Sequence, residues 1–192
     1  MENKILSSIN DAIKAASYLK KPESLYFIKT LVDLLADGFK AGKKVLIAGN
    51  GGSLCDAIHF AEELTGQFRG KRKALPAISL ADVGHISCVA NDYGYEHVFS
   101  RAVEAYGHPG DIFVALSTSG NSQNLINAVV KAKEMELVVV SFLGKTGGVL
   151  KGLSDLEWIV EGFEYSDRIQ EAHMAAIHIA IEILEQKLFY EG

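Results

Sequence analysis

Residues 44–64, KVLIAGNGGSLCDAIHFAEEL, join an apolar run, a glycine-rich turn and an expected helix in one short segment. The apolar run at residues 44–48 is short and continuous, which is typical of a strand that is buried on both faces of a parallel sheet. The turn GNGGS at residues 49–53 follows directly, and residues 54–64 are predicted to form a helix. A strand that leads through a turn into a helix is the repeating unit of α/β folds, so this segment indicates the fold class.

The same alternation continues along the rest of the chain. Further strands are predicted at residues 77–80, 112–116, 137–142 and 157–160. Helices are predicted at residues 3–20, 23–41, 82–107 (with breaks at Asn91 and Gly94) and 123–134, and a long one at about 167–189. This pattern predicts a doubly wound, five-stranded parallel sheet flanked by helices, with N-terminal helices and a long C-terminal helix. We expect a single domain over residues 1–192, in which residues 1–42 are the N-terminal helices and residues 43–192 the α/β core and C-terminal helix.

Composition and charge exclude several classes of protein. The net charge of −5 argues against a nucleic-acid partner, which would require a basic face. Two cysteines, Cys55 and Cys88, imply no disulfide framework and fit a reducing compartment. Residues 1–10 lack the apolar core of a signal peptide, and the most apolar late stretch, residues 175–184, is too short to span a bilayer. We therefore expect a cytoplasmic protein with no membrane contact.

Two polar turns follow strands and are expected at the same edge of the sheet, where open parallel sheets bind ligands. The turn at residues 49–53 is not a dinucleotide fingerprint, because Leu54 replaces its third glycine, and no lysine follows as in a P-loop. It is equally consistent with a ligand-binding backbone turn and with a tight strand-to-helix turn. The turn at residues 117–122, STSGNS, offers four hydroxyl groups at a helix start. A helix cap by Ser119 or Asn121 would need only one such group, so the turn favours a phosphate site.

Two helical segments carry candidate metal ligands. His59 and Glu63 are four residues apart and share a helix face, where they could bind a divalent metal or form an ordinary surface pair. His178 lies among isoleucines, and such a histidine is more often a hydrogen-bonded core residue than a ligand. For the remaining histidines we expect surface positions: these are His85, His97, His108 and His173.

Four stretches together resemble the phosphoheptose isomerase family of the sugar-isomerase (SIS) domain superfamily. They are AGNGGSLCDAIHFAEELTG (48–66), HISCVANDYGYEHVFSR (85–101), LSTSGNSQN (116–124) and DRIQEAHMAAIH (167–178). The resemblance implies the SIS fold and an aldose–ketose isomerase that converts sedoheptulose 7-phosphate to D-glycero-D-manno-heptose 7-phosphate. This reaction is the first step of ADP- or GDP-heptose synthesis for surface polysaccharide. The resemblance also implies a homotetramer with active sites near subunit boundaries, in which residues 1–42 pack between subunits.

The resemblance also assigns roles to individual residues. It implies one Zn²⁺ per subunit with His59, Glu63, Gln170 and His178 as ligands, and Glu63 and His178 as the acid/base pair. The implied substrate contacts are Asn50, Gly51, Gly52, Glu63, Asn91, Asp92, Ser117, Thr118, Ser119, Ser122 and Gln170, with the serine-rich turn binding the phosphate. Asp167 is implied in a supporting role. The family often has an arginine directly after Leu-Thr-Gly, whereas this chain has Gln67 there and Arg69 two residues later.

Helix geometry restricts how such a metal site could be built. Gln170 and His178 are eight residues apart, which is about 12 Å along a continuous helix. Both can reach one metal only if the site lies at a frayed helix start or is shared between subunits.

Three other functions remain as alternatives. A non-catalytic SIS-domain regulator that binds sugar phosphates, similar to regulators of replication initiation, would keep the fold but lack parts of the acid/base set. An amino-sugar phosphate isomerase of the same superfamily would not need a metal. A nucleotide-dependent oxidoreductase is the weakest alternative, because Leu54 interrupts the fingerprint.

Overall fold

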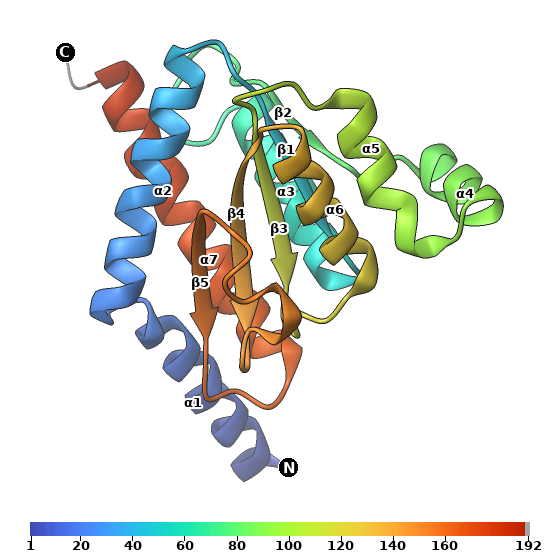
Figure 1. Cartoon of the computed structure of the whole chain (residues 1–192). Coiled ribbons are helices and arrows are strands. Elements are labelled where there is room, and N and C mark those ends of the chain that lie inside the picture. Colours follow the sequence, from blue (N-terminus) through green and yellow to red (C-terminus); the bar gives the residue numbers. More distant parts are fainter. Residues whose placement is uncertain (191–192) are drawn as a thin grey trace.

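Five parallel strands form the central sheet in the order β2-β1-β3-β4-β5 (Figure 1). The computed structural model describes residues 1–190. The strands are β1 (Val45–Gly49), β2 (Ala77–Ser79), β3 (Ile112–Ser117), β4 (Val138–Gly144) and β5 (Leu156–Val160). β1 and β3 are buried along their whole length, which explains why their sequences are continuous apolar runs rather than alternating ones.

Helices cover both faces of this sheet, as the sequence predicts. One face is covered by α1 (Glu2–Tyr18), α2 (Pro22–Lys40), α3 (Gly52–Thr65) and α7 (Ser166–Glu185). The other face is covered by α4 (Val83–Asp92), α5 (Val98–Tyr106) and α6 (Gln123–Glu134). Two 3₁₀ turns, η1 (Tyr95–His97) and η2 (Gly148–Leu150), and a π-helical turn, η3 (Gln186–Tyr190), complete the regular structure. None of the helices within residues 1–190 is long and apolar enough to cross a membrane.

The two N-terminal helices differ in how they are buried. Phe27 of α2 stacks on Trp158 of β5 at 5.5 Å between ring centroids and meets Phe142 of β4 edge-on at 4.9 Å. The indole N–H of Trp158 donates to the hydroxyl of Ser24 at 3.0 Å, so this buried polar group is satisfied. α2 is therefore part of the core. On α1, by contrast, the apolar residues Ile5, Ile9 and Ile13 are each about half exposed, at 53%, 48% and 58%.

The predicted elements agree with the structure apart from local boundaries. The segment 82–107 has one interruption rather than two, because α4 continues through Asn91 and ends at Asp92. The chain then turns at Gly94, whose φ of +99° is accessible to glycine and unfavourable for other residues. Asn91 has no such backbone requirement, so polarity alone misplaced the first break.

The surface position predicted for His173 is wrong, because this residue is fully buried in α7. Its Nε2–H donates to the carbonyl oxygen of Leu143 at 3.0 Å, and Nδ1 has no partner among the described residues. Burial lowers the pKa of His173 to about 4, and the hydrogen bond to Leu143 offsets only part of this effect. The imidazole is therefore neutral at physiological pH.

His173 should make the fold sensitive to acid. The pKa of its side chain is lower in the folded chain than the ordinary value of 6.5, so unfolding takes up a proton below that value. Its contribution to the free energy of unfolding is complete above pH 6.5 and should decline towards pH 4, by up to about 3 kcal/mol. This contribution can be measured from the free energy of unfolding in urea of the wild type and of His173→Gln between pH 6.5 and pH 4. Equal slopes against pH for the two proteins would contradict the assignment.

Candidate functional site

The carboxyl ends of β1 and β3 bring the two polar turns together. The strands pair in parallel, with Gly49 opposite Leu116, so the turns that follow them begin side by side. The chain continues from β1 to β2 on one side, while β3 lies on the other, which makes this edge a topological switch point. The two polar turns predicted at residues 49–53 and 117–122 thus lie at one edge of the sheet.

A polar cavity of about 170 Å³ lies at this edge. Its lining is composed mainly of hydroxyl and amide side chains: Asn50, Ser53, Leu116, Ser117, Thr118, Ser119, Ser122, Ser166 and Gln170. Helices α3, α6 and α7 begin at Gly52, Gln123 and Ser166, so three helix N-termini surround the cavity. Unpaired N–H groups and the helix dipoles at such ends favour an anion. The cavity is chemically suited to a phosphate group.

The hydroxyl groups of the serine-rich turn are not used to cap the following helix. Ser122 is the N-cap of α6, and its side chain makes no capping hydrogen bond in the described part of the chain. Ser119 Oγ accepts from the backbone N–H of Asn121 at 3.2 Å, and Asn121 Oδ1 accepts from Val149 N at 3.1 Å. Neither Ser119 nor Asn121 therefore has the capping role that was the alternative to a phosphate site.

The turn after β1 is held in place by amide side chains. Asn50 and Asn124 exchange two hydrogen bonds of 2.9 Å, and the hydroxyl of Tyr95 donates to Asn50 Oδ1 at 3.0 Å. A Cβ atom on Gly52 would lie 2.6 Å from the Gln170 side-chain nitrogen, so a larger residue there would displace the Gln170 amide. Gly51 has a φ of +57°, which also favours glycine.

Two residues that line the cavity were missed by the sequence analysis. Ser53 and Ser166 lie in the first turns of α3 and α7, and Thr118 Oγ1 donates to Ser166 Oγ at 3.0 Å. A serine at a predicted helix start is a recognisable signal for a cap or an anion site, and it could have identified both.

Asn91, Asp92 and Asp167 are not brought to the cavity. Asn91 and Asp92 end α4, are exposed, and bond to each other at 2.7 Å. α4 lies at the far side of the molecule from α7 (Figure 1). Asp167 is exposed in the first turn of α7, with its carboxylate 3.5 Å from Arg168. None of the three lines the cavity in the described chain.

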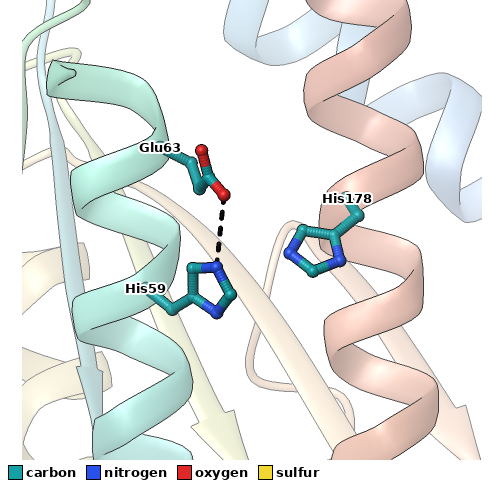
Figure 2. Close-up of side chains that lie close together, drawn as sticks. All are labelled: His59, Glu63 and His178. Atoms are coloured by element: carbon teal, nitrogen blue, oxygen red, sulfur yellow. Dashed lines mark hydrogen bonds and ion pairs between the residues drawn. The ribbon is translucent and has the colours of Figure 1, made fainter. Parts of the chain in front are cut away.

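A second polar group of side chains lies farther along α3 and α7. His59 Nε2 is 3.2 Å from Glu63 Oε1, and the rings of His59 and His178 are 5.0 Å apart between centroids. Figure 2 shows His59 and Glu63 on α3 facing His178 on α7. One ligand atom from each residue lies within 4.8 Å of the others, so the three could hold a metal ion. The structure thus brings His178 to the pair that helix spacing had already joined.

The chemistry of this cluster fits zinc. Two imidazole nitrogens and one carboxylate oxygen are a ligand set that zinc accepts, and three protein ligands leave a position for a fourth. Burial, and then the neighbouring His59, lower the pKa of His178, although Glu63 acts in the opposite direction. His178 is thereby favoured in the neutral form that can bind a metal.

Gln170 does not join this cluster within one chain. Its side-chain nitrogen lies 3.4 Å from Ser53 Oγ beside the polar cavity. α7 is regular from Ser166 to Glu185, so Gln170 and His178 are separated by about 12 Å along one helix. The helix has no frayed start at Gln170, so the first of the two expected arrangements is not found.

The segment after α3 places a charge beside the cluster. Gln67 is exposed, whereas Arg69 forms an ion pair with Glu182 of α7. The Arg69 guanidinium lies 5.4 Å from the ring centroid of Phe68, and Phe68 stacks on His178 at 5.7 Å. Arg69 is therefore directed towards α7, next to a candidate ligand.

Comparison with known proteins places this site in a family. The family model described as "SIS domain" matches residues 10–144. A phosphoheptose isomerase from Fusobacterium nucleatum subsp. nucleatum is 55% identical over 91% of this chain and 90% of its own length. One from Salmonella paratyphi B is 50% identical over 96% of each chain.

A solved structure agrees with these relatives. The structure of a phosphoheptose isomerase from Francisella tularensis matches with a TM-score of 0.88 and 33% identity, covering 96% of this chain and 97% of that one. The match extends over the N-terminal helices, the sheet and the long C-terminal helix. By sequence and by fold, this chain belongs to the phosphoheptose isomerase family of SIS-domain proteins.

Proposed function

We propose that this chain is the aldose–ketose isomerase that converts sedoheptulose 7-phosphate to D-glycero-D-manno-heptose 7-phosphate, the first step of ADP- or GDP-heptose synthesis for surface polysaccharide. The observation that carries the proposal is the cluster of His59, Glu63 and His178 on facing helices. The relatives named phosphoheptose isomerase support the choice of reaction. A cytoplasmic location is part of the proposal, since both cysteines are exposed and unpaired.

The isomerisation moves a proton between adjacent carbons through a cis-enediol, so it requires a base and an acid close together. Glu63 and His178 are the proposed pair: one removes the proton from carbon and the other protonates oxygen. A zinc ion held by His59, Glu63 and His178, with Gln170 of the partner subunit, would polarise the substrate oxygens as a Lewis acid. Bound zinc in the purified protein would also separate this function from that of metal-independent amino-sugar phosphate isomerases.

The proposed phosphate site is the polar cavity beyond β1 and β3. Ser117, Thr118, Ser119 and Ser122 would bind the phosphate oxygens through hydroxyl and backbone groups. The proposed substrate contacts from the first turn are Asn50, Gly51 and Gly52. Asp167 would have a supporting role. Asn91 and Asp92 would contact substrate in the site of another subunit. The distance of α4 from α7 is consistent with that assignment (Figure 1).

A homotetramer with sites near subunit boundaries completes the proposal. The half-exposed apolar residues of α1, Ile5, Ile9 and Ile13, are spaced at four residues and share one helix face. A largely apolar groove of about 270 Å³ between α2 and α7 offers a second surface, with Ile179 and Ile183 in its lining. Both features support packing between copies of the chain.

Substituting Glu63, one member of the proposed acid/base pair, tests the chemistry directly. Glu63→Gln keeps the shape of the side chain but cannot accept a proton at neutral pH, so kcat should fall by about 10²–10⁴ with little change in KM. His178→Gln should show a similar fall, and the double variant should fall by less than the product of the two, because the residues act as a unit. Steady-state kinetics on sedoheptulose 7-phosphate measures all three.

Glu62→Gln is the matched control for this experiment. Glu62 is the adjacent carboxylate, 3.6 Å from the same His59 ring but exposed, and its substitution should leave kcat unchanged. Activity of folded Glu63→Gln within a few-fold of wild type would mean that Glu63 is not the base.

The phosphate site predicts a different kinetic change. Ser119→Ala and Ser122→Ala should each raise KM, because each removes one charge-assisted hydrogen bond to the phosphate. The expected loss of binding free energy is about 1.5–3 kcal/mol for each. Ser154→Ala removes a hydroxyl group outside the cavity and should leave KM as it is. Two unchanged KM values for Ser119→Ala and Ser122→Ala would rule out the proposed phosphate position.

The shared site can be tested by mixing inactive variants. We expect a tetramer in light scattering and expect Gln170→Ala and His178→Gln homotetramers to be impaired. If each site takes Gln170 and His178 from different subunits, randomly mixed tetramers should recover up to about a quarter of the wild-type activity. A fully active monomer, or mixtures no more active than their parents, would contradict a shared site.

A further inference from the structure

A buried guanidinium group lies just beyond the cluster of candidate ligands. The side chain of Arg72 is fully buried, in the segment that leads from α3 to β2. Its Nη2 donates to the carbonyl oxygen of Glu63 at 2.6 Å, and its Nη1 to that of Leu64 at 2.8 Å. These carbonyl groups belong to the last turn of α3, where backbone acceptors have no partner within the helix. Arg72 therefore holds the end of the helix that carries Glu63.

The same guanidinium group is anchored to α7. Arg72 Nε donates to Glu185 Oε1 at 2.6 Å, and the backbone N–H of Arg69 donates to Glu185 Oε2 at 3.2 Å. Glu185 is 3% exposed. Burial alone would raise the pKa of Glu185, but hydrogen bonds from Arg72 and the backbone hold it below its usual value, so the carboxylate stays charged. Glu185 follows His178 by seven residues, which places both on one face of α7.

We propose that Arg72 and Glu185 form a brace that sets the position of Glu63 relative to His178. The brace joins the backbone of Glu63 on α3 to the helix face of α7 that carries His178. Neither Arg72 nor Glu185 is among the described residues that line the polar cavity or form the candidate metal cluster, so both are positioning residues. The inference rests on the proposed roles of Glu63 and His178 and adds a determinant of their separation.

Stability alone does not account for a buried ion pair of this kind. Removing two charges from water is costly, and well-packed apolar side chains of similar volume often stabilise a fold equally well or better. Apolar side chains cannot, however, form directional hydrogen bonds to two helix carbonyl groups and a carboxylate at once. A planar guanidinium group can, because its donors are fixed on three separate nitrogen atoms, whereas all three donors of lysine are on one nitrogen.

The test compares three changes at the brace with a loss of a buried charge elsewhere. The brace variants are Arg72→Lys, Glu185→Gln and the apolar pair Arg72→Met/Glu185→Leu. The control is Asp111→Asn, which weakens the contacts of a 3% exposed carboxylate with Lys44, where the two residues precede β3 and β1. The measurements are the free energy of unfolding in urea, kcat and KM for sedoheptulose 7-phosphate, and the Kd for Zn²⁺ of metal-stripped protein in competition with a chromogenic chelator.

We expect the brace variants to lose more zinc affinity and activity than their loss of stability alone would explain. The Kd for Zn²⁺ should rise by about 10–100-fold and kcat should fall by about 10-fold or more, because the ligands are no longer oriented. KM should stay within about two-fold, since the phosphate cavity is untouched. For Arg72→Lys, the Kd for Zn²⁺ and kcat should lie between those of wild type and those of the other brace variants. Asp111→Asn should lose stability without changing kcat or the Kd for Zn²⁺.

Two outcomes separate the brace from the proposed function. Folded Glu185→Gln and Arg72→Lys proteins with wild-type kcat and wild-type Kd for Zn²⁺ would overturn the brace, whether or not the apolar pair folds. An active Glu63→Gln protein would instead overturn the proposed acid/base roles. In that case the Kd for Zn²⁺ of the brace variants still tests whether Arg72 and Glu185 orient the ligands.

Discussion

The packing of α3 against α7 is the constraint on which the rest of the site depends. The two helices are joined at three levels along their length. Near their N-termini, Ser53 and Gln170 are 3.4 Å apart; in the middle, the rings of His59 and His178 are 5.0 Å apart between centroids. Beyond these, the Arg72–Glu185 pair connects the last turn of α3 to α7. The polar cavity, the candidate metal cluster and the brace therefore lie one after another along the same contact between two helices.

The sequence was informative wherever local pattern determines structure. The buried strands could be recognised because both sheet faces are covered, which leaves β1 and β3 without polar alternation. His59 and Glu63 could be paired because helical spacing alone places them on one face. The two turns could be placed at one sheet edge because parallel strands end together. All three predictions depend on contacts near in sequence or on the regular geometry of a parallel sheet.

Contacts between distant elements were beyond the reach of pattern. His178 and His173 both have apolar neighbours along α7, yet His178 faces His59 of α3, while His173 donates to Leu143 of β4. Nothing in their spacing tells which of them meets a polar partner, because that depends on which helix lies over which strand. The same holds for Arg72 and Glu185, which are 113 residues apart and meet only once α7 has packed beside α3. The family resemblance implied a role for His178, and the structure places its ring 5.0 Å from that of His59 between centroids.

The polar cavity and the candidate acid/base groups are held in place by different parts of the fold. This difference explains how a chain with net negative charge can bind an anionic sugar phosphate. No lysine or arginine is among the described residues that line the cavity beyond β1 and β3. Favourable charge there comes instead from the N-termini of α3, α6 and α7, whose positions are fixed by the sheet. The candidate acid/base groups lie on side chains farther along α3 and α7, whose separation is fixed by helix packing and by Arg72. A net charge of −5 is therefore compatible with binding a phosphorylated substrate, because the cavity uses backbone dipoles that the overall charge does not count.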